Sequence, residues 1–314
     1  MEVIHELPLI SHTDIRIYFH PDARIPKLMQ PQPHNTFPPQ HQNRQPGREA
    51  EMNPRPQYDN PAYKASGKLA GKKAIITGGD SGIGRAIALA YAKEGADVAI
   101  IHLCENGDAQ ETIKAIESIG RKCIAIPSDL RIEKNAAHAV EQAVSQLGGI
   151  DILINNAAVQ YPQNSLLDIT EEQLIDTFKS NFFSYFYMTK AVLPHLSNGC
   201  AMINTASITA FEGNQTLIDY SSTKGAIVSF TRSMALSLID KGIRVNAVAP
   251  GPVWTPLIVS SFAPEKVQTF GSTSPMQRAA QPYELAPAYV FLGCEDSSNI
   301  SGQIFHVNSG TIIN

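Results

Sequence analysis

A glycine-rich turn at residues 77–84 constrains the fold of this chain more than any other feature. Its sequence, TGGDSGIG, lies between an apolar run of strand length and the first helical pattern. Gly78 permits a sharp turn, Gly82 lets the backbone approach a bound group, and Gly84 lets the helix pack closely on a sheet. The N-terminus of that helix presents free N–H groups to an anion. The segment therefore predicts a strand–turn–helix unit that binds the pyrophosphate of a dinucleotide.

Strand-length apolar runs alternate with helical patterns from Lys72 onward. The expected strands are Ala74–Thr77, Val98–Leu103, Cys123–Ser128, Ile150–Asn155, Ala201–Ala206, Val245–Ala249 and Gln303–Val307. The expected helices are Ala86–Lys93, Ala109–Ile119, Ala136–Leu147, Glu171–His195, Tyr220–Ile239 and Glu284–Leu292. This alternation is typical of a parallel sheet with helices on both faces. We expect one α/β domain at residues 66–314, a Rossmann-type doubly wound parallel sheet with a flexible lid at about 254–278.

The composition changes near residue 66. Before it, roughly half of the chain's 21 prolines lie among Gln, Asn and His. Proline removes backbone donors, and such a segment has little apolar surface to bury, so residues 1–65 are expected to form a Pro-rich, extended or mobile N-terminal arm. Its part from Phe37 to Lys64 could lie over a neighbouring surface. Residues before Met29 are expected to add nothing to fold or chemistry, and Met29 is a candidate natural start.

Composition and charge argue against several classes of partner. The net charge is −4 without a long basic run, which disfavours nucleic acid as a partner. No apolar stretch reaches the ~18 residues that cross a bilayer. The four cysteines are scattered without a CxxC pair, and most histidines lie in the N-terminal arm. We therefore expect reduced thiols, a cytoplasmic protein, no membrane segment and no metal site.

Tyr220 and Lys224 form a second informative pair, which follows Ser207 along the chain. On a helix the two side chains are one turn apart and face the same way. An isolated phenol has a pKa near ~10, and a nearby ammonium group favours the phenolate. The pair is therefore predicted to be an acid/base unit.

Two further segments lie where a dinucleotide would be held. Asp129 follows the third predicted strand and could accept a hydrogen bond from an adenine amino group, or it could be a helix cap. The small residues of 155–158, with the sequence NNAA, end the fourth strand, where a flat ring can lie against the backbone.

These segments together resemble the short-chain dehydrogenase/reductase family, from about Lys72 to the C-terminus. The shared motifs are Thr77–Gly84, Asn155–Ala158, Ser207 with Tyr220 and Lys224, and Pro250-Gly251. The resemblance implies a catalytic tetrad completed by Asn181, which would hold a water in a proton relay. It implies that Ser207 holds the substrate oxygen and that Tyr220 is the acid/base. Lys224 would bind the nicotinamide ribose and lower the pKa of Tyr220.

A narrower resemblance points to the glucose/ribitol dehydrogenase-like branch, which includes bacterial stress proteins and seed proteins. It is carried by FPPQ at residues 37–40, QPG at 45–47 and MNP at 52–54, and by GPVWTPL at 251–257. The chain departs from the family at two positions. Ala158 stands where glycine is usual, and Asn308-Ser309-Gly310 stands where the family has N-G-G.

The family resemblance extends to the cofactor and substrate residues. The predicted cofactor-binding residues are Gly78, Ser81, Gly82, Ile83, Gly84, His102, Asp129, Leu130, Asn156, Ala157, Ala158, Tyr220, Lys224, Pro250, Gly251, Val253 and Thr255. Candidate walls of the substrate pocket are Gln160, Tyr161, Glu212, Asn214 and Trp254. The second strand ends at His102 with neither an adjacent acid nor an arginine, so NAD and NADP both remain open.

The predicted function is hydride transfer between NAD or NADP and a carbinol or carbonyl carbon of a small polyol, sugar or aldehyde. A nucleotide-binding regulator on the same fold is the alternative, although it would not need Ser207, Tyr220 and Lys224 together. The YxxxK spacing disfavours an enoyl reductase, and the TGxxxGxG turn disfavours a nucleotide-sugar epimerase. The resemblance also implies a homotetramer paired through the helices at Glu171–His195 and Tyr220–Ile239, which carry many aromatic residues.

Overall fold

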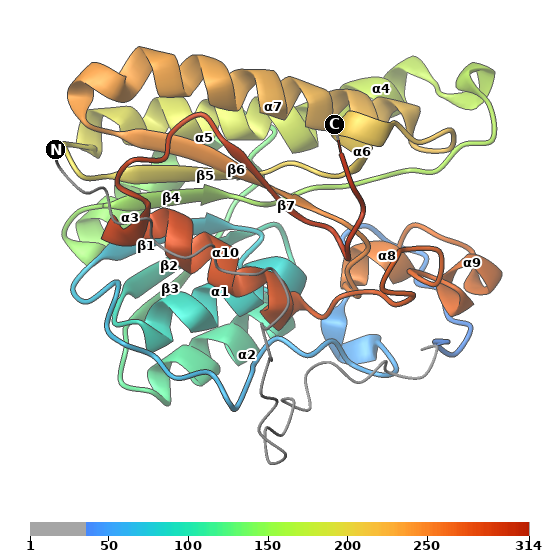
Figure 1. The fold of residues 1–314 in the computed structure, drawn as a ribbon, viewed down its shortest axis with the longest axis horizontal. Coiled ribbons are helices and arrows are strands. Elements are labelled where there is room, and N and C mark those ends of the chain that lie inside the picture. Colours follow the sequence, from blue (N-terminus) through green and yellow to red (C-terminus); the bar gives the residue numbers. More distant parts are fainter. Residues whose placement is uncertain (1–35, 314) are drawn as a thin grey trace, which may run out of the picture. The chain divides into compact units, whose positions relative to one another are not determined.

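The structure is a computed structural model that describes residues 36–313. Seven strands form one parallel sheet in the order β3-β2-β1-β4-β5-β6-β7 (Figure 1). The strands are β1 Lys73–Thr77, β2 Asp97–His102, β3 Cys123–Pro127, β4 Ile152–Asn155, β5 Ala201–Thr205, β6 Arg244–Pro250 and β7 Ile304–Val307. The order reverses between β1 and β4, which makes the sheet doubly wound and confirms the predicted fold class.

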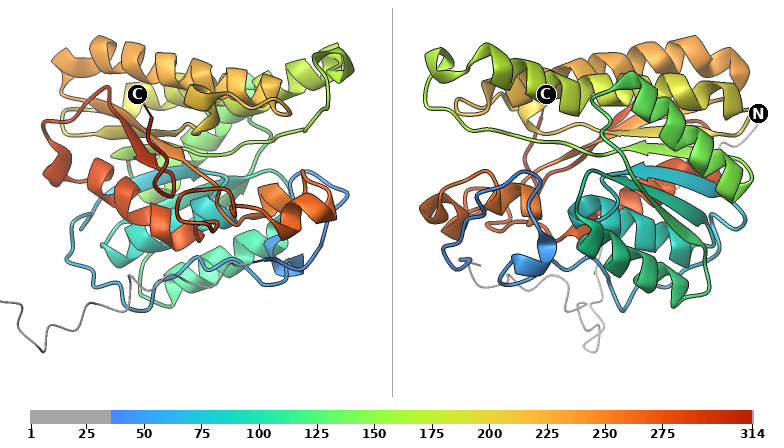
Figure 2. Two further views of the ribbon diagram at one scale, coloured as in Figure 1. Left: turned by 45° about the vertical axis from the view of Figure 1, so that its right-hand side comes forward. Right: turned by 180° about the vertical axis from the view of Figure 1, so that it is seen from behind.

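Helices cover both faces of the sheet (Figures 1 and 2). One face packs against α1 Gly82–Lys93, α2 Asn106–Glu117 and α10 Pro282–Gly293. The other packs against α3 Glu133–Leu147, α5 Ser184–Val192 and α7 Ile218–Leu238. Successive side chains of a strand point to opposite faces. Thus Ala74 and Ile76 belong to the first core cluster and Ile75 to the second.

The long helix expected at Glu171–His195 is divided into four pieces. It comprises α4 Glu171–Phe178, a π-helical turn η4 Lys179–Phe183, α5, and a 3-10 turn η5 Leu193–His195. A π turn inserts an extra residue into the helical ladder, and such insertions occur often at functional sites. The helical period alone did not reveal this turn. Other helices begin two to four residues earlier than predicted, since α1 begins at Gly82 inside the glycine turn.

Short elements complete the described chain. They are η2 Glu49–Glu51, η3 Leu166–Asp168, α6 Thr209–Glu212, η6 Ile239–Lys241, α8 Pro256–Val259, α9 Pro264–Gln268 and η7 Glu295–Ser297. A bridge between Val253 and Ala280 closes the base of the lid, which holds α8 and α9. No helix in the described part of the chain is long and apolar enough to cross a membrane.

The arm segment, residues 36–64, packs on the rest of the domain and does not project from it. Figure 2 shows this segment, in blue, beside α8 and α9. Phe37 and Met52 are buried in one apolar cluster with Trp254, Ile258 and Val259 of the lid. The arm expected over a neighbouring surface therefore covers the lid of its own chain. The prediction about Met29 lies outside the described residues.

Candidate active site

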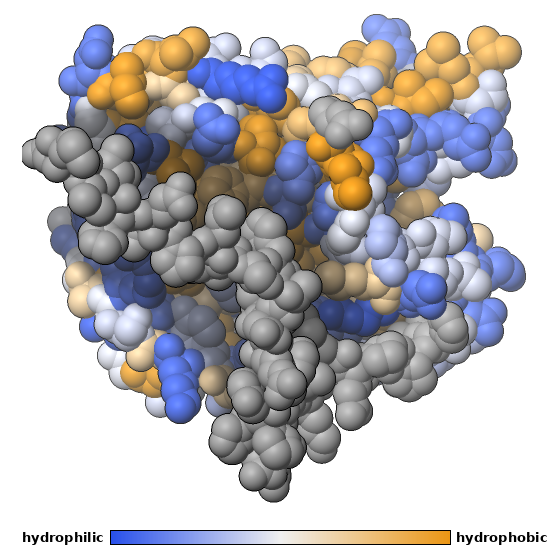
Figure 3. Space-filling view, in the orientation of Figure 1, coloured by the Kyte–Doolittle hydropathy of each residue, from blue (hydrophilic) through white to orange (hydrophobic). Residues whose placement is uncertain are grey.

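A cavity of about 1240 Å³ lies at the carboxyl ends of the central strands. Ligands of doubly wound sheets bind there, at the point where the strand order reverses. Figure 3 shows the molecule hollowed between the α4 side and the lid. Sixteen predicted cofactor residues line the cavity: Gly78, Ser81, Gly82, Ile83, His102, Asp129, Leu130, Asn156, Ala157, Ala158, Tyr220, Lys224, Pro250, Gly251, Val253 and Thr255. Gly84 is the exception, because it packs behind the turn.

The glycine turn is tied to the end of β4. Gly78 has a φ of 63°, which favours glycine, and a Cβ added at Gly84 would come within 1.9 Å of the Gly78 carbonyl oxygen. Thr77 Oγ1 accepts hydrogen bonds from the backbone N–H groups of Asn156, at 2.8 Å, and Ala157, at 3.1 Å. The turn and the small residues after β4 thus form one rigid edge of the cavity.

The residues at this edge fit a dinucleotide. A Cβ added at Gly82 would lie 3.2 Å from Thr255 Cβ. Glycine at this position therefore leaves room for a bound group to approach the backbone closely. The first N–H groups of α1 have no partner within the helix and suit a pyrophosphate. At the end of β2, His102 Nε2 pairs with Asn106 Oδ1 at 2.9 Å, while its buried Nδ1 has no partner among the described residues.

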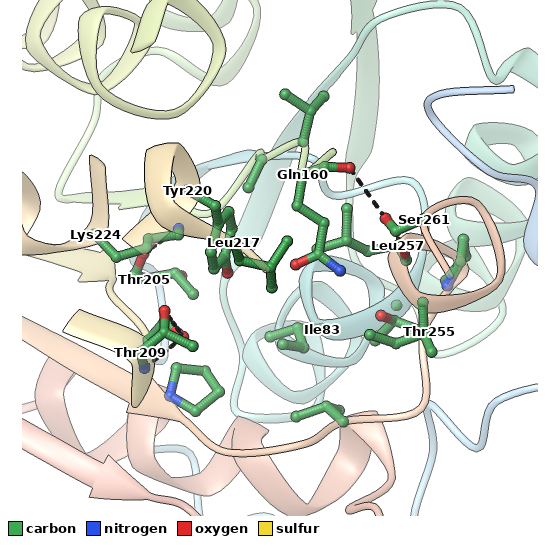
Figure 4. Close-up of a pocket in the computed structure, with 18 of the residues that line it drawn as sticks. Ile83, Gln160, Thr205, Thr209, Leu217, Tyr220, Lys224, Thr255, Leu257 and Ser261 are labelled. Atoms are coloured by element: carbon green, nitrogen blue, oxygen red, sulfur yellow. Dashed lines mark hydrogen bonds between the residues drawn. The ribbon is translucent and has the colours of Figure 1, made fainter. Parts of the chain in front are cut away.

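Ser207, Tyr220 and Lys224 all line the cavity, at the part that we call its inner end, and Figure 4 shows Tyr220 beside Lys224. Tyr220 and Lys224 come from α7, and Ser207 follows β5. Lys224 Nζ donates to the Thr205 carbonyl oxygen at 2.8 Å and lies 5.5 Å from the centre of the Tyr220 ring. The Ser207 hydroxyl accepts hydrogen bonds from the N–H and hydroxyl groups of Thr209. The predicted grouping of these three side chains is therefore present.

Burial dominates the electrostatics of Tyr220 and Lys224. It raises the pKa of Tyr220 to about 12, and a hydrogen bond with Ser207 opposes the increase. Burial also lowers the pKa of Lys224 to about 7. Both charged forms lose hydration when they are buried. Sequence spacing gives no measure of burial, so it could not predict these shifts, and the lowering of the Tyr220 pKa by Lys224 stays a prediction.

Asn181 lies in the π-helical turn η4 and is fully buried. Its Oδ1 accepts from the Val159 N–H at 2.8 Å, and its Nδ2 donates to the Val159 carbonyl at 2.9 Å and to Thr223 Oγ1 at 3.2 Å. The side chain therefore joins the segment after β4 to α7 and does not line the cavity. The described contacts make Asn181 a support for the site, and its part in a proton relay stays a prediction.

Asp129 lines the cavity but is paired within the protein. Its carboxylate accepts from the Arg131 backbone N–H at 3.0 Å and from Arg131 Nε at 2.9 Å, and this pairing lowers its pKa. Arg131 also pairs with Asp176 at 2.7 Å, and Asp176 accepts from the Tyr161 hydroxyl at 3.0 Å. Sequence analysis did not single out Arg131 and Asp176, because no motif or regular spacing links these two residues.

Four of the five predicted substrate residues line the cavity: Gln160, Tyr161, Glu212 and Asn214. Trp254 does not, and its prediction as a pocket wall is wrong. Its side chain is fully buried, its ring stacks on Phe37, and its Nε1 donates to the Pro54 carbonyl at 2.9 Å. The arm covers this tryptophan from outside. Residues 45–47 of the arm line the cavity instead, although sequence reasoning treated them only as a branch signature.

The C-terminal turn carries Ser309 where the family resemblance leads one to expect glycine. Ser309 has a φ of 59°, in the left-handed region that favours glycine. Asn308 packs directly against Gly251, where an added Cβ would lie 2.7 Å from Asn308 Cα. The departure from N-G-G therefore places a strained serine beside the cavity and leaves the contact with Gly251 in place.

Comparisons with known proteins agree with this geometry. A family model described as Enoyl-(Acyl carrier protein) reductase matches residues 78–311. General stress protein 39 of Bacillus subtilis is 55% identical over 277 residues, covering 88% of this chain and 97% of that protein. The glucose and ribitol dehydrogenase of Daucus carota is 53% identical over 284 residues, covering 88% and 98% respectively. A short-chain dehydrogenase from Burkholderia cenocepacia in complex with NADP has a TM-score of 0.73 at 30% identity, covering 77% of this chain and 98% of that chain.

The doubly wound sheet, the glycine turn and the buried Ser–Tyr–Lys group define an oxidoreductase of the dinucleotide-dependent class. The similar proteins identify the family. The chain belongs to the short-chain dehydrogenase/reductase family, and its relatives include a stress protein and a glucose and ribitol dehydrogenase. Both resemblances predicted from the sequence are thereby confirmed.

Proposed function

We propose that the protein binds NAD or NADP and transfers hydride between the nicotinamide and a carbinol or carbonyl carbon of a small polyol, sugar or aldehyde. One observation carries the proposal: Ser207, Tyr220 and Lys224 line the same cavity as the glycine turn. A regulator that only binds a nucleotide would not need an acid/base group at the inner end of its pocket.

The roles of the residues follow from their places. The bound cofactor supplies or accepts the hydride. The start of α1 would hold its pyrophosphate, with Gly82 leaving room for the close approach, and Thr255 would hold its nicotinamide end. Ser207 would hold the substrate oxygen, while Tyr220 would donate a proton to it during reduction or remove one during oxidation. Lys224, buried beside Tyr220, would bind the nicotinamide ribose.

The polar walls of the cavity favour a hydroxylated substrate. Gln160 Nε2 is buried without a hydrogen-bond partner in the described part of the chain, so it has a donor available for a substrate hydroxyl. Tyr161, Glu212 and Asn214 add hydroxyl, carboxylate and amide groups to the same wall. The name of the carrot relative, glucose and ribitol dehydrogenase, supports the same substrate class.

The decisive experiment is a substrate panel. Polyols with NAD and NADP, and sugars and aldehydes with NADH and NADPH, should be followed by the absorbance of the reduced nicotinamide. Activity with at least one polyol, sugar or aldehyde is expected. An enoyl thioester belongs in the panel, because the matched family model is described as an enoyl reductase. Turnover of the enoyl thioester alone would overturn the proposal, and binding of a nucleotide without any turnover would favour the regulatory alternative.

We further propose a cytoplasmic homotetramer. All four cysteines are free thiols, as expected in a reducing compartment. Phe183 and Phe186, at the η4–α5 stretch, expose 37% and 47% of their surface, and Leu236 of α7 exposes 80%. Tyr185, another aromatic residue of this stretch, is buried in its own chain. Exposed apolar side chains along these helices suit pairing between copies, and light scattering that shows a stable monomer at micromolar concentration would contradict it.

A further inference from the structure

The arm segment reaches from the lid to the glycine turn. At the lid end, the Phe37 N–H donates to the Gln268 carbonyl at 3.1 Å and the Gln42 N–H to the Val259 carbonyl at 2.8 Å. Gly47 lies so close to α8 that an added Cβ would come within 2.6 Å of the Pro256 carbonyl oxygen. The lid predicted to be flexible is therefore fastened along its outer side by backbone contacts.

At the other end, Glu49 contacts the glycine turn itself. One carboxylate oxygen accepts from the Gly82 N–H at 2.7 Å, and the other accepts from Arg85 Nη1 at 2.6 Å. The Glu49 N–H donates to Asp108 Oδ2 at 2.9 Å. Glu49 and Arg85 are fully buried. Burial raises the pKa of Glu49 to about 7, while Arg85 and the Gly82 N–H oppose the increase. Both carboxyl oxygens have partners inside the domain, so the arm is a built part of it and not a tail resting on it.

Gln45 joins the arm to the substrate side of the cavity. Its Nε2 donates to the Gln160 carbonyl at 2.8 Å and to Ser261 Oγ at 3.0 Å. Ser261 Oγ also donates to the Gln160 carbonyl at 3.2 Å, as the dashed line in Figure 4 shows. The arm, Ser261 two residues after α8, and the pocket wall thus share one hydrogen-bonded group.

We propose that the arm segment is part of the cofactor site, with Glu49 as the positioning residue of the glycine turn and Gln45 as the positioning residue of the lid. The proposal rests on the proposed function, since the group positioned is NAD or NADP. Glu49 occupies the first free N–H of α1 and holds Gly82 at its φ of 51°. The N–H group of Ile83, the next in the helix and part of the cavity lining, would then face the pyrophosphate in a fixed direction.

Charge balance supports this division of roles. A carboxylate beside a phosphate would repel it, but the guanidinium of Arg85 lies between the acidic groups, 2.6 Å from Glu49 and 3.6 Å from Asp108. Arg85 also donates to the carbonyl oxygens of Asp80, inside the turn, and Asp108, in α2. Arg85 therefore pairs with the carboxylate that contacts Gly82 and ties the turn to α2.

The test is equilibrium binding of NADH and NADPH to full-length protein by isothermal titration calorimetry. Glu49→Gln keeps the shape of the side chain but removes one of its two acceptor oxygens. We expect its Kd for the preferred nucleotide to rise about tenfold, which corresponds to ~1.4 kcal/mol, with a matching rise in the cofactor KM and little change in kcat. Glu51→Gln is the matched control, because Glu51 is exposed on the same turn and pairs only with Arg48 among the described residues.

The outcomes distinguish a residue that positions the glycine turn from one that only stabilises the fold. If Glu49→Gln lowers the melting temperature but leaves Kd within about twofold of the wild type, or tightens it, the proposal is overturned. If that variant does not fold, Gln45→Ala decides: faster NADH dissociation in stopped flow supports the proposal, and an unchanged rate overturns it. Failure of the wild type to bind either nucleotide would instead overturn the proposed function, so the two failures are distinguishable.

Discussion

The rings of Phe37 and Trp254 stack face to face, with their centroids 3.6 Å apart and their planes within 4° of parallel. One ring belongs to the arm and the other to the start of the lid, and both are buried. Aromatic pairs of this kind add a geometric preference to the area that they bury. The contact places the only tryptophan of the chain at the junction of two segments that border the cavity.

Phe37→Ala should therefore loosen this junction. We expect the free energy of unfolding to fall by about 3–5 kcal/mol, as is usual when a buried phenylalanine is truncated. Denaturant unfolding followed by Trp254 fluorescence would measure it. Pro39→Ala, at an exposed position of the same segment, should leave the midpoint in place. Equal midpoints for Phe37→Ala and the wild type would show that the stack adds no stability.

Tyr220→Phe keeps the ring and removes the transferable proton. Turnover should fall by roughly 10²–10⁴, the usual contribution of an acid/base group, while the cofactor still binds. Steady-state rates together with calorimetric binding would check both statements. Tyr187→Phe on α5, away from the cavity, serves as the control. Wild-type turnover in Tyr220→Phe would remove this residue from the mechanism.

Gly84→Ala should abolish cofactor binding. The new methyl group would come within 1.9 Å of the Gly78 carbonyl oxygen, so the turn must distort. Gly107→Ala is the matched control, since nothing lies within 4 Å of its added Cβ in α2, and a helical alanine should stabilise by roughly 0.5–1 kcal/mol. Calorimetric titration with NADH and NADPH would measure the difference. Unchanged affinity in Gly84→Ala would contradict the assigned role of this turn.

Lys224 should make stability depend on pH. Burial lowers its pKa to about 7 in the folded protein, from the ordinary lysine value of 10.5. Between these values the unfolded chain binds more protons, so this residue makes stability rise as the pH increases from 7 toward 10. Urea unfolding across that range should show a steeper rise for the wild type than for Lys224→Met. Parallel curves for the two proteins would argue that Lys224 is neutral or charged in both states.

Deletions should divide the N-terminal region in two. Removing residues 1–28 should leave the melting temperature and the activity unchanged, because the family-like segment begins only near residue 35. Removing residues 1–64 should lower both, since it takes away the buried Phe37, Glu49 and Met52. Thermal melts and initial rates would compare the two deletions. A large loss of activity in the shorter deletion would refute the boundary.

The sheet and the inner end of the cavity followed well from sequence, because they depend on local signals. Strand-length runs such as 74–77 and 201–206 and the glycine turn are each readable within a few residues. The motifs of Tyr220 and Asn156 lie at strand or helix ends that the parallel fold brings to one edge. Sixteen of the seventeen predicted cofactor residues accordingly line the cavity.

The failures share a different cause, which is contact between distant segments. Whether Trp254 faces the cavity depends on Phe37 and Pro54, and no local pattern shows that the arm returns to the lid. In the sequence, Glu49 is one acidic residue in a polar arm, and nothing near it indicates that its partner is the N–H group of Gly82. Pairing between such segments is set by tertiary packing, which periodicity does not encode.

The docking of the arm on the lid also sets an order of events during synthesis. The Pro54 carbonyl cannot accept its hydrogen bond until the indole of Trp254 has been synthesised, 200 residues later. Gln45 likewise lacks its partner until Ser261 has been synthesised. The glycine turn and the first strands can form while the ribosome is still working, since chains fold from the N-terminal side. The cavity wall made by residues 45–47 cannot form until the last fifth of the chain begins to emerge. A nascent chain halted before the lid would leave the site open on that side, with the arm undocked from the lid.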